Sequence, residues 1–213
     1  MQYVNLSDKG YLYYDLPLSD ENHIKTKQYW EEACKIYENG GDETKYINYL
    51  RKKTQLALLE KDSEKAIKAA EKGLEEIEVS PYAYQQTFFK WWFYHALAEA
   101  YLLCYKNEFI DDIEKALERA HFYSDILMSN KKFYYLQLKA VYMYYLGRLD
   151  EALELNNEAK KLIDSSNYRL KAPSIKKQLM ENENVFKSTL KKSNTKLYSQ
   201  IHTTDMQFNL PCI

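Results

Sequence analysis

The 213-residue sequence contains little glycine and little proline, with five residues of the first and four of the second. Strand-rich sandwiches and barrels need many turn residues, so this scarcity argues against both. The sequence is instead 46% hydrophobic and 29% charged, a balance that suits a mostly helical globular protein. A chain of this length can bury one sizeable core. We therefore expect a single all-α domain.

The sequence also lacks a large net charge, a secretion signal and a recognisable cysteine motif. The formal charge is -1, so no overall field favours a nucleic acid or a membrane surface. The first ten residues have no basic segment followed by an apolar run, and we expect a cytoplasmic protein. Cys34, Cys104 and Cys212 show neither metal-type nor redox-type spacing and are predicted to be reduced thiols.

Catalytic and cofactor motifs are missing as well. The four histidines form no H-E-x-x-H or Cys-His pattern, and the sequence has no G-x-S-x-G elbow and no P-loop. His95 and Glu99 are four residues apart and could meet as an acid-base pair on one helix face. That spacing is common, so we expect only a surface hydrogen bond between them. We predict no enzyme activity, no metal and no cofactor.

The most apolar window of the chain covers residues 88–105 and is interrupted by Lys90, His95 and Glu99. A membrane span needs about 20 predominantly apolar residues, so this window predicts a buried central helix and no membrane association. Aromatic residues are dense here, and the chain has 21 tyrosines. One helix face cannot bury so many rings, so either neighbouring helices share them or a partner covers them. We expect most of them to be shared within the core.

Hydrophobic periodicity, caps and turn residues predict eight helices within a domain that covers residues 19–192. Ser63 is the expected cap of the third helix. Residues 1–18 are predicted to form an irregular arm, and residues 193–213 a flexible or loosely docked tail. The expected helices are about 20–39, 43–61, 64–79, 83–106, 109–128, 132–146, 149–163 and 174–191.

The segment 140–159 is the most informative part of the chain. A helical pattern that includes Ala140 stops at Gly147, which can take the left-handed conformation that ends a helix. A second pattern follows, in which Ala152 and Ala159 are seven residues apart on one face. Small side chains at these positions allow two antiparallel helices to approach closely.

This segment resembles a tetratricopeptide repeat, a helical hairpin that stacks on copies of itself. Ala66 and Gly73 repeat the spacing of the small residues. In the middle hairpin, Ile113 and Ala120 match only if about three residues are inserted. Ala66 and Ala152 are 86 positions apart, or 43 for each of two repeats, which is longer than the roughly 34 residues of the family. The resemblance implies antiparallel hairpins stacked as a right-handed solenoid of about eight helices.

Long aromatic-rich repeats of this kind also resemble the peptide receptors and response-regulator phosphatases of Gram-positive bacteria. Those proteins enclose a short peptide in a superhelix. This chain shows no helix-turn-helix region ahead of its three or so hairpins, so the likeness is architectural and no phosphatase residue is carried over. It implies a protein or peptide partner on the concave face, as in an adaptor, a receptor, or an inhibitor or immunity protein of a bacterium or phage.

The first helix of each hairpin lines the concave face in that family. Basic side chains there could hold a carboxylate, amides could pair with a peptide backbone, and rings could anchor a partner. The expected partner-binding residues are Asn48, Arg51, Lys52, Gln55, Trp92, His95, Glu99, Tyr134, Gln137, Val141 and Tyr144.

Two other functions remain open. One is a regulator with enzyme-like chemistry at His95 and Glu99. The other, with less support, is nucleic-acid binding by a basic strip near the end of the chain, although such strips are usually solvated helix faces. A homodimer is also open, because uncapped solenoid ends tend to stack. The strip consists of Lys187, Lys191, Lys192 and Lys196.

Overall fold

The computed structural model describes residues 20–39, 43–79, 83–127, 132–165 and 172–195. Within these ranges the protein is all-helical and has no strand, so the predicted all-α class is confirmed. The predicted arm and the tail beyond Thr195 lie outside the described residues. The last helix continues a few residues past the predicted end of the domain.

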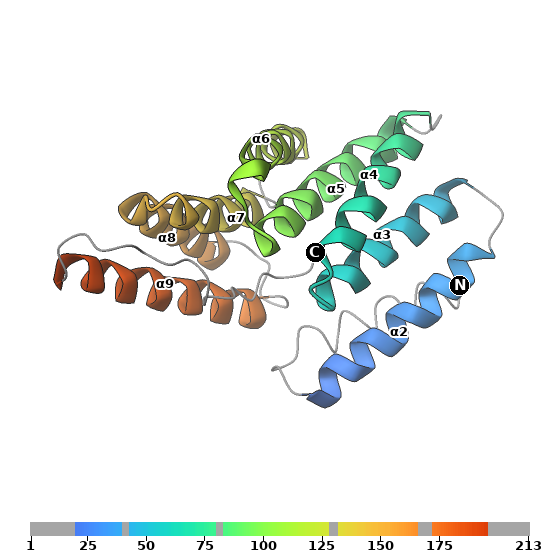
Figure 1. Cartoon of the computed structure of the whole chain (residues 1–213). Helices are drawn as coiled ribbons and strands as arrows, with labels where there is room; N and C mark the ends of the chain where they lie inside the picture. Colours follow the sequence, from blue (N-terminus) through green and yellow to red (C-terminus); the bar gives the residue numbers. More distant parts are fainter. Residues whose placement is uncertain (1–19, 40–42, 80–82, 128–131, 166–171, 196–213) are drawn as a thin grey trace.

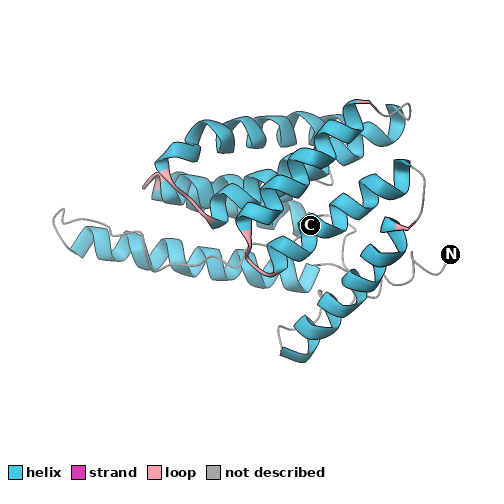
Figure 2. Ribbon diagram, turned by 45° about the vertical axis from the view of Figure 1, so that its right-hand side comes forward, coloured by secondary structure: helices cyan, strands magenta, loops and turns pink. Residues whose placement is uncertain are grey.

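Each of the eight predicted helices is present, with ends that differ from the prediction by a few residues. The helices follow one another along the array in chain order (Figure 1), and the loops and turns that Figure 2 colours pink are short. They are α2 (Asp20–Glu38), α3 (Glu43–Leu59), α4 (Ser63–Glu78), α5 (Ala83–Leu103), α6 (Ile110–Ile126), α7 (Lys132–Tyr145), α8 (Leu149–Ser165) and α9 (Ala172–Thr195), with a 3-10 helix η1 (Asn107–Phe109) before α6.

The turn between α7 and α8 has the glycine geometry that the sequence predicts. Gly147 has a φ of 76°, in the left-handed region. Its N–H donates to the carbonyl of Tyr144 at 3.0 Å, and the N–H of Arg148 donates to the carbonyl of Met143 at 2.9 Å. These two bonds form a Schellman motif, which satisfies carbonyls that the helix end would leave unpaired.

The turn between α3 and α4 repeats this geometry without a glycine. Lys61 has a φ of 57°, and its N–H donates to the carbonyl of Leu58 at 3.0 Å. The N–H of Asp62 donates to the carbonyl of Ala57 at 2.8 Å. The same Schellman motif therefore forms around a lysine, a residue that is rarely left-handed.

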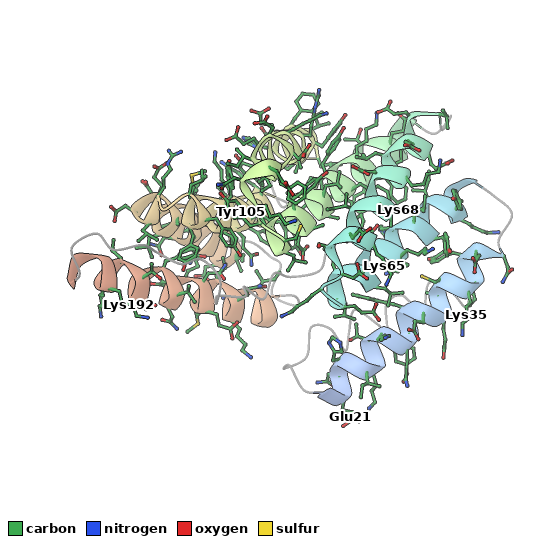
Figure 3. The ribbon with its side chains drawn as sticks, viewed as in Figure 1. Glu21, Lys35, Lys65, Lys68, Tyr105 and Lys192 are labelled. Atoms are coloured by element: carbon green, nitrogen blue, oxygen red, sulfur yellow. The ribbon has the colours of Figure 1, made fainter. Side chains whose placement is uncertain are left out.

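The start of α4 corrects one prediction from the sequence. The N-cap is Asp62 and not Ser63, because Asp62 Oδ1 accepts a hydrogen bond from the N–H of Lys65 at 3.1 Å. This bond satisfies one of the free amides of the first turn. Lys65 and Lys68 lie along α4 in Figure 3.

Small residues lie where the helices cross, as predicted. Gly73 of α4 shows how close the packing is, because a Cβ added there would lie 2.3 Å from Cζ of the Phe93 ring in α5. No residue other than glycine fits this position without moving the ring. The predicted small residues Ala66, Ala140 and Ala152 are all fully buried, and so is Ala98 of α5.

The middle hairpin has a longer connection than the other two. Residues 60–62 separate α3 from α4, and residues 146–148 separate α7 from α8. In contrast, residues 104–109 separate α5 from α6, and the 3-10 helix lies within them. The predicted insertion of three residues is therefore confirmed, and Ile113 and Ala120 are both fully buried on α6.

We call helices α3, α5 and α7 the first-helix layer, because α5 contacts both α3 and α7 in addition to its neighbours along the chain. In the first half of α5, the Trp91 ring centroid lies 6.1 Å from that of Tyr134 near the start of α7. Just past the end of α5, Tyr105 stacks on Tyr145 at 4.5 Å. Contacts at both ends show that α5 and α7 run side by side in the same direction.

Helix α5 is the buried central helix that its apolar window predicts. Trp91, Trp92 and Phe93 are at most 1% exposed, because neighbouring helices cover several sides of α5. Tyr94, for example, stacks on Tyr123 of α6 at 5.9 Å. The rings are thus shared in the core, as expected. No helix in the described ranges has both the length and the apolar character that crossing a bilayer requires.

Two cysteines lie within the described residues, and both are free thiols as predicted. Cys34 is buried, and its burial raises the pKa of the thiol to about 12. The thiolate is the reactive form, so this cysteine is unreactive at neutral pH. Cys212 lies outside the described residues.

Candidate functional site

The eleven predicted partner-binding residues all lie on the first-helix layer, but their exposure differs. Asn48, Arg51 and Tyr144 are half-buried. A partner can contact these three directly, and it can reach the others only if neighbouring side chains move. The other eight are buried, namely Lys52, Gln55, Trp92, His95, Glu99, Tyr134, Gln137 and Val141.

Arg51 of α3 lies over an aromatic platform on α5. Its guanidinium carbon is 5.9 Å from the ring centroids of Phe88, Phe89 and Trp92. Attraction between the cation and the ring faces holds the guanidinium in place. Among the described residues, Nε of Arg51 has no hydrogen-bond partner. Arg51 is therefore a positioned cation with hydrogen-bonding capacity left for another group.

Lys52 and Gln55 face a different neighbour. The Nζ atom of Lys52 donates to Oε1 of Gln55 at 2.8 Å and lies 5.0 Å from the ring centroid of Trp30 in α2. The structure therefore brings these two predicted residues together, but against α2. Lys52 points away from Arg51 because successive side chains of an α-helix are turned about 100° apart, whereas Gln55 lies one turn after Arg51.

His95 and Glu99 are not on the surface, so the predicted location of this pair is wrong. His95 is 0% exposed and Glu99 is 1% exposed, because α5 lies between other helices. Burial raises the pKa of Glu99 well above the ordinary 4.5. A carboxyl group without a nearby cation loses hydration on burial and keeps its proton.

A cluster of three rings, one of which is His95, joins α5 to α7. The His95 ring centroid lies 5.9 Å from that of Trp91 and 5.7 Å from that of Tyr134, the second in an edge-to-face arrangement. Trp91 is not among the predicted residues. Its spacing of four residues from His95 places both on one helix face, and this signal could have identified it.

The register of α5 against α7 places Gln137 near Glu99, because the flanking pairs His95–Tyr134 and Tyr105–Tyr145 are in ring contact. Gln137 lies one turn after Tyr134, as Glu99 lies one turn after His95, and the two helices run in the same direction. Gln137 is 0% exposed. Within the described ranges, neither amide atom of Gln137 has a hydrogen-bond partner, and Oε2 of Glu99 has none either. Buried polar groups rarely lack partners, so we call these two residues the Glu99–Gln137 pair and treat it as a candidate site.

Tyr144, a predicted anchoring ring, is covered on one side by α9. Its ring stacks on Phe186 at a centroid distance of 5.2 Å, and its hydroxyl lies 3.3 Å from Oγ1 of Thr189. Val141, one turn earlier, is part of the core. The end of α7 therefore packs on the last helix.

The alternative sites have less support in the structure. Of the residues it describes, no group of His, Cys, Asp and Glu is arranged to hold a metal ion. In the basic strip, Lys187 pairs with Glu183, which also pairs with Lys160. These bonds lower the pKa of Glu183 and neutralise part of the strip. Lys196 lies outside the described residues.

Comparison with known proteins identifies no relative. No protein-family model, no curated protein and no solved structure matches the chain. The function is therefore inferred from the side chains of the first-helix layer.

Proposed function

We propose that this protein is a non-enzymatic helical-repeat module whose first-helix layer holds a peptide or an extended segment of a partner protein. The main support is a row of three polar side chains at equivalent positions. Arg51, His95 and Gln137 each lie eight residues before the last residue of their helices, α3, α5 and α7. Such a row suits a ligand that crosses all three helices, contacts Arg51 directly and reaches the buried His95 and Gln137 when neighbouring side chains move.

The helix arrangement supports a tetratricopeptide-like right-handed solenoid. The first and third hairpins have the same turn, and small residues fill their helix crossings. The first helices lie side by side, which in a stacked repeat produces one continuous surface. Such a protein would act in the cytoplasm as an adaptor, a receptor or an inhibitor.

The spacing of the row matches an extended chain. Packed helices lie about 8–10 Å apart, and an extended chain advances about 3.3 Å per residue. Successive polar side chains of the row would therefore meet every third residue of the bound segment. A segment of about seven to nine residues would cross all three helices.

The charge of α3 indicates the direction of that segment. Lys45, Arg51, Lys52 and Lys53 lie on this helix, whose one acidic residue is Glu43. An acidic group of the partner would therefore lie over α3, with its carboxylate on Arg51. Such a charge-assisted bond can be bidentate, which adds specificity to affinity.

The test is to identify partners by affinity capture from the native cell and then to measure their affinity for variants. Arg51→Ala should weaken binding by about 1.5–3 kcal/mol, because it removes a hydrogen bond to a charged group. Added salt should weaken the wild-type complex and reduce the difference. Lys53→Ala is the matched control for the general charge of α3, since Lys53 is exposed on the same helix and carries the same charge, so Arg51→Ala should weaken binding more than Lys53→Ala does.

Equal affinity of Arg51→Ala and the wild type, with unchanged thermal stability, would exclude this face as the docking surface. Trp92 is unsuited to the same test, although the sequence identifies it as an anchor. It is 1% exposed, and its replacement by alanine would cost about 3–5 kcal/mol of folding stability. Loss of binding in that variant would not distinguish recognition from unfolding.

A further inference from the structure

The Glu99–Gln137 pair contains three buried polar atoms that have no hydrogen-bond partner among the described residues, namely Oε2 of Glu99 and both amide atoms of Gln137. Ring contacts lie on both sides of it, between His95 and Tyr134 toward the start of α5 and between Tyr105 and Tyr145 beyond its end. Leaving such groups without hydrogen bonds in the interior is costly. A ligand that supplies both a donor and an acceptor would remove that cost.

The hydrogen-bonding capacity of the pair is that of two neutral groups. Burial raises the pKa of the Glu99 carboxyl and so favours its neutral form, which has one O–H donor and one carbonyl acceptor. The Gln137 amide also has donors and an acceptor. The nearest cation of the row, Arg51, is on α3 and contacts the rings of α5 from that side. The pair therefore matches an uncharged group and offers no charge to an anion.

We propose that Glu99 and Gln137 form a subsite for an uncharged amide, either a peptide group or the carboxamide of an asparagine or glutamine, in the segment that the first-helix layer holds. An amide has one donor side and one acceptor side, so it can bond to both residues at once. A carboxylate lacks the donor and would have to give up its hydration without a compensating cation. This inference rests on the proposed function and adds selectivity to it.

The Tyr105–Tyr145 stack is the more open side of the subsite. Both rings are half-buried, whereas His95 is fully buried and Tyr134 nearly so. Tyr105 is labelled in Figure 3, where it lies toward α7. A bound segment would therefore approach from this end of α5 and displace the tyrosine rings to reach the pair.

Two small probes of nearly equal shape, acetamide and acetate, test the proposal on the full chain. Each is titrated into isotopically labelled protein while the side-chain amide signal of Gln137 is followed by NMR. Acetamide should shift that signal, and acetate should need at least about tenfold more to do so, a ratio that equals about 1.4 kcal/mol. The exposed side chain of Asn157 is the control, and its signal should not move with either probe.

Variants of Glu99 make the outcome decisive. Glu99→Gln keeps a neutral donor and acceptor and should retain the acetamide response. Glu99→Leu removes both and should lose it. If Glu99→Leu does not fold, the wild type and Glu99→Gln decide, because the contrast between the two probes does not need the third protein. Equal shifts with both probes, or no shift with acetamide, would overturn the proposal.

The probes need no partner, so this result is independent of the test of the proposed function. A response to acetamide together with an ineffective Arg51→Ala would reject the proposed docking face and keep the amide subsite. The reverse result would keep the docking face and reject the subsite.

Discussion

The α3–α4 hairpin and the α7–α8 hairpin have the same framework, although their equivalent alanines, Ala66 and Ala152, are 86 positions apart in the sequence. Both turns carry the same pair of backbone hydrogen bonds. Both second helices have small buried residues seven apart, with Gly73 and Ala159 as the later of each two. The shared framework is therefore made from backbone bonds and small side chains.

The two hairpins differ in the side chains that the first helix presents. Arg51 in α3 corresponds to Gln137 in α7, and Gln55 corresponds to Val141, each at the same 86-residue spacing. One hairpin is basic at this position and the other is neutral. The framework therefore does not restrict the residue type at these positions, so one array can offer a charged contact at one end and an uncharged contact at the other.

The largest expected effect concerns the shared framework. Ala66→Leu and Ala152→Leu should each lower the free energy of unfolding by about 1–3 kcal/mol, because both alanines are fully buried at helix crossings. Urea denaturation measures both, with Glu154→Leu at an exposed position of α8 as the control. If only one alanine responds, the two hairpins do not share one framework. An unchanged midpoint in both would mean that the crossings lie elsewhere.

A smaller effect tests the neutral character of the α5–α7 side. In the folded protein the pKa of Glu99 is raised well above its ordinary value of 4.5 by burial, whereas the unfolded chain releases this proton near pH 4.5. Above about pH 4.5 the unfolded state therefore binds fewer protons. The stability contributed by Glu99 is complete below this pH and falls by about 1.4 kcal/mol per pH unit until the folded pKa is reached.

The effect of Glu99 is measured as the difference in free energy of unfolding between the wild type and Glu99→Gln, from denaturant titrations at several pH values. Taking this difference cancels the contributions of Glu21, Asp62 and Glu183. Their lowered pKa values stabilise the protein above the ordinary range, and that stabilisation is lost in acid. Parallel pH profiles for the two proteins would show that Glu99 is ionised when folded. The amide subsite would then lose its donor.

The smallest effect comes from the left-handed position of the two turns, which is a lysine in one and a glycine in the other. Lys61→Gly should stabilise the protein by about 0.5–1 kcal/mol, since relief of a left-handed side chain exceeds the extra entropy of glycine in the unfolded chain. Gly147→Ala should destabilise it by about 1 kcal/mol through conformation alone. No atom lies within 4 Å of an added Cβ there. Thermal denaturation should show opposite signs, and equal signs would refute the shared turn geometry.

Much of the fold can be predicted from local sequence patterns. The glycine that ends α7 and the longer connection of the middle hairpin follow from residue type and spacing. The left-handed Lys61 does not, because lysine has no preference for that conformation and the backbone bonds of the turn impose it. The cap at Asp62 was missed by one residue, a shift that periodicity does not resolve.

The sequence by itself determined the helices and turns of this protein, because hydrogen bonds and propensities within a few residues decide them. Only the tertiary structure decided what the polar side chains of the first-helix layer face. Helix α5 is apolar on nearly all sides, so its sequence pattern does not reveal which face lines a groove and which face packs in the core. Contacts with α3 and α7 buried Glu99 and left Arg51 half-exposed, and those contacts join residues about 40 positions apart.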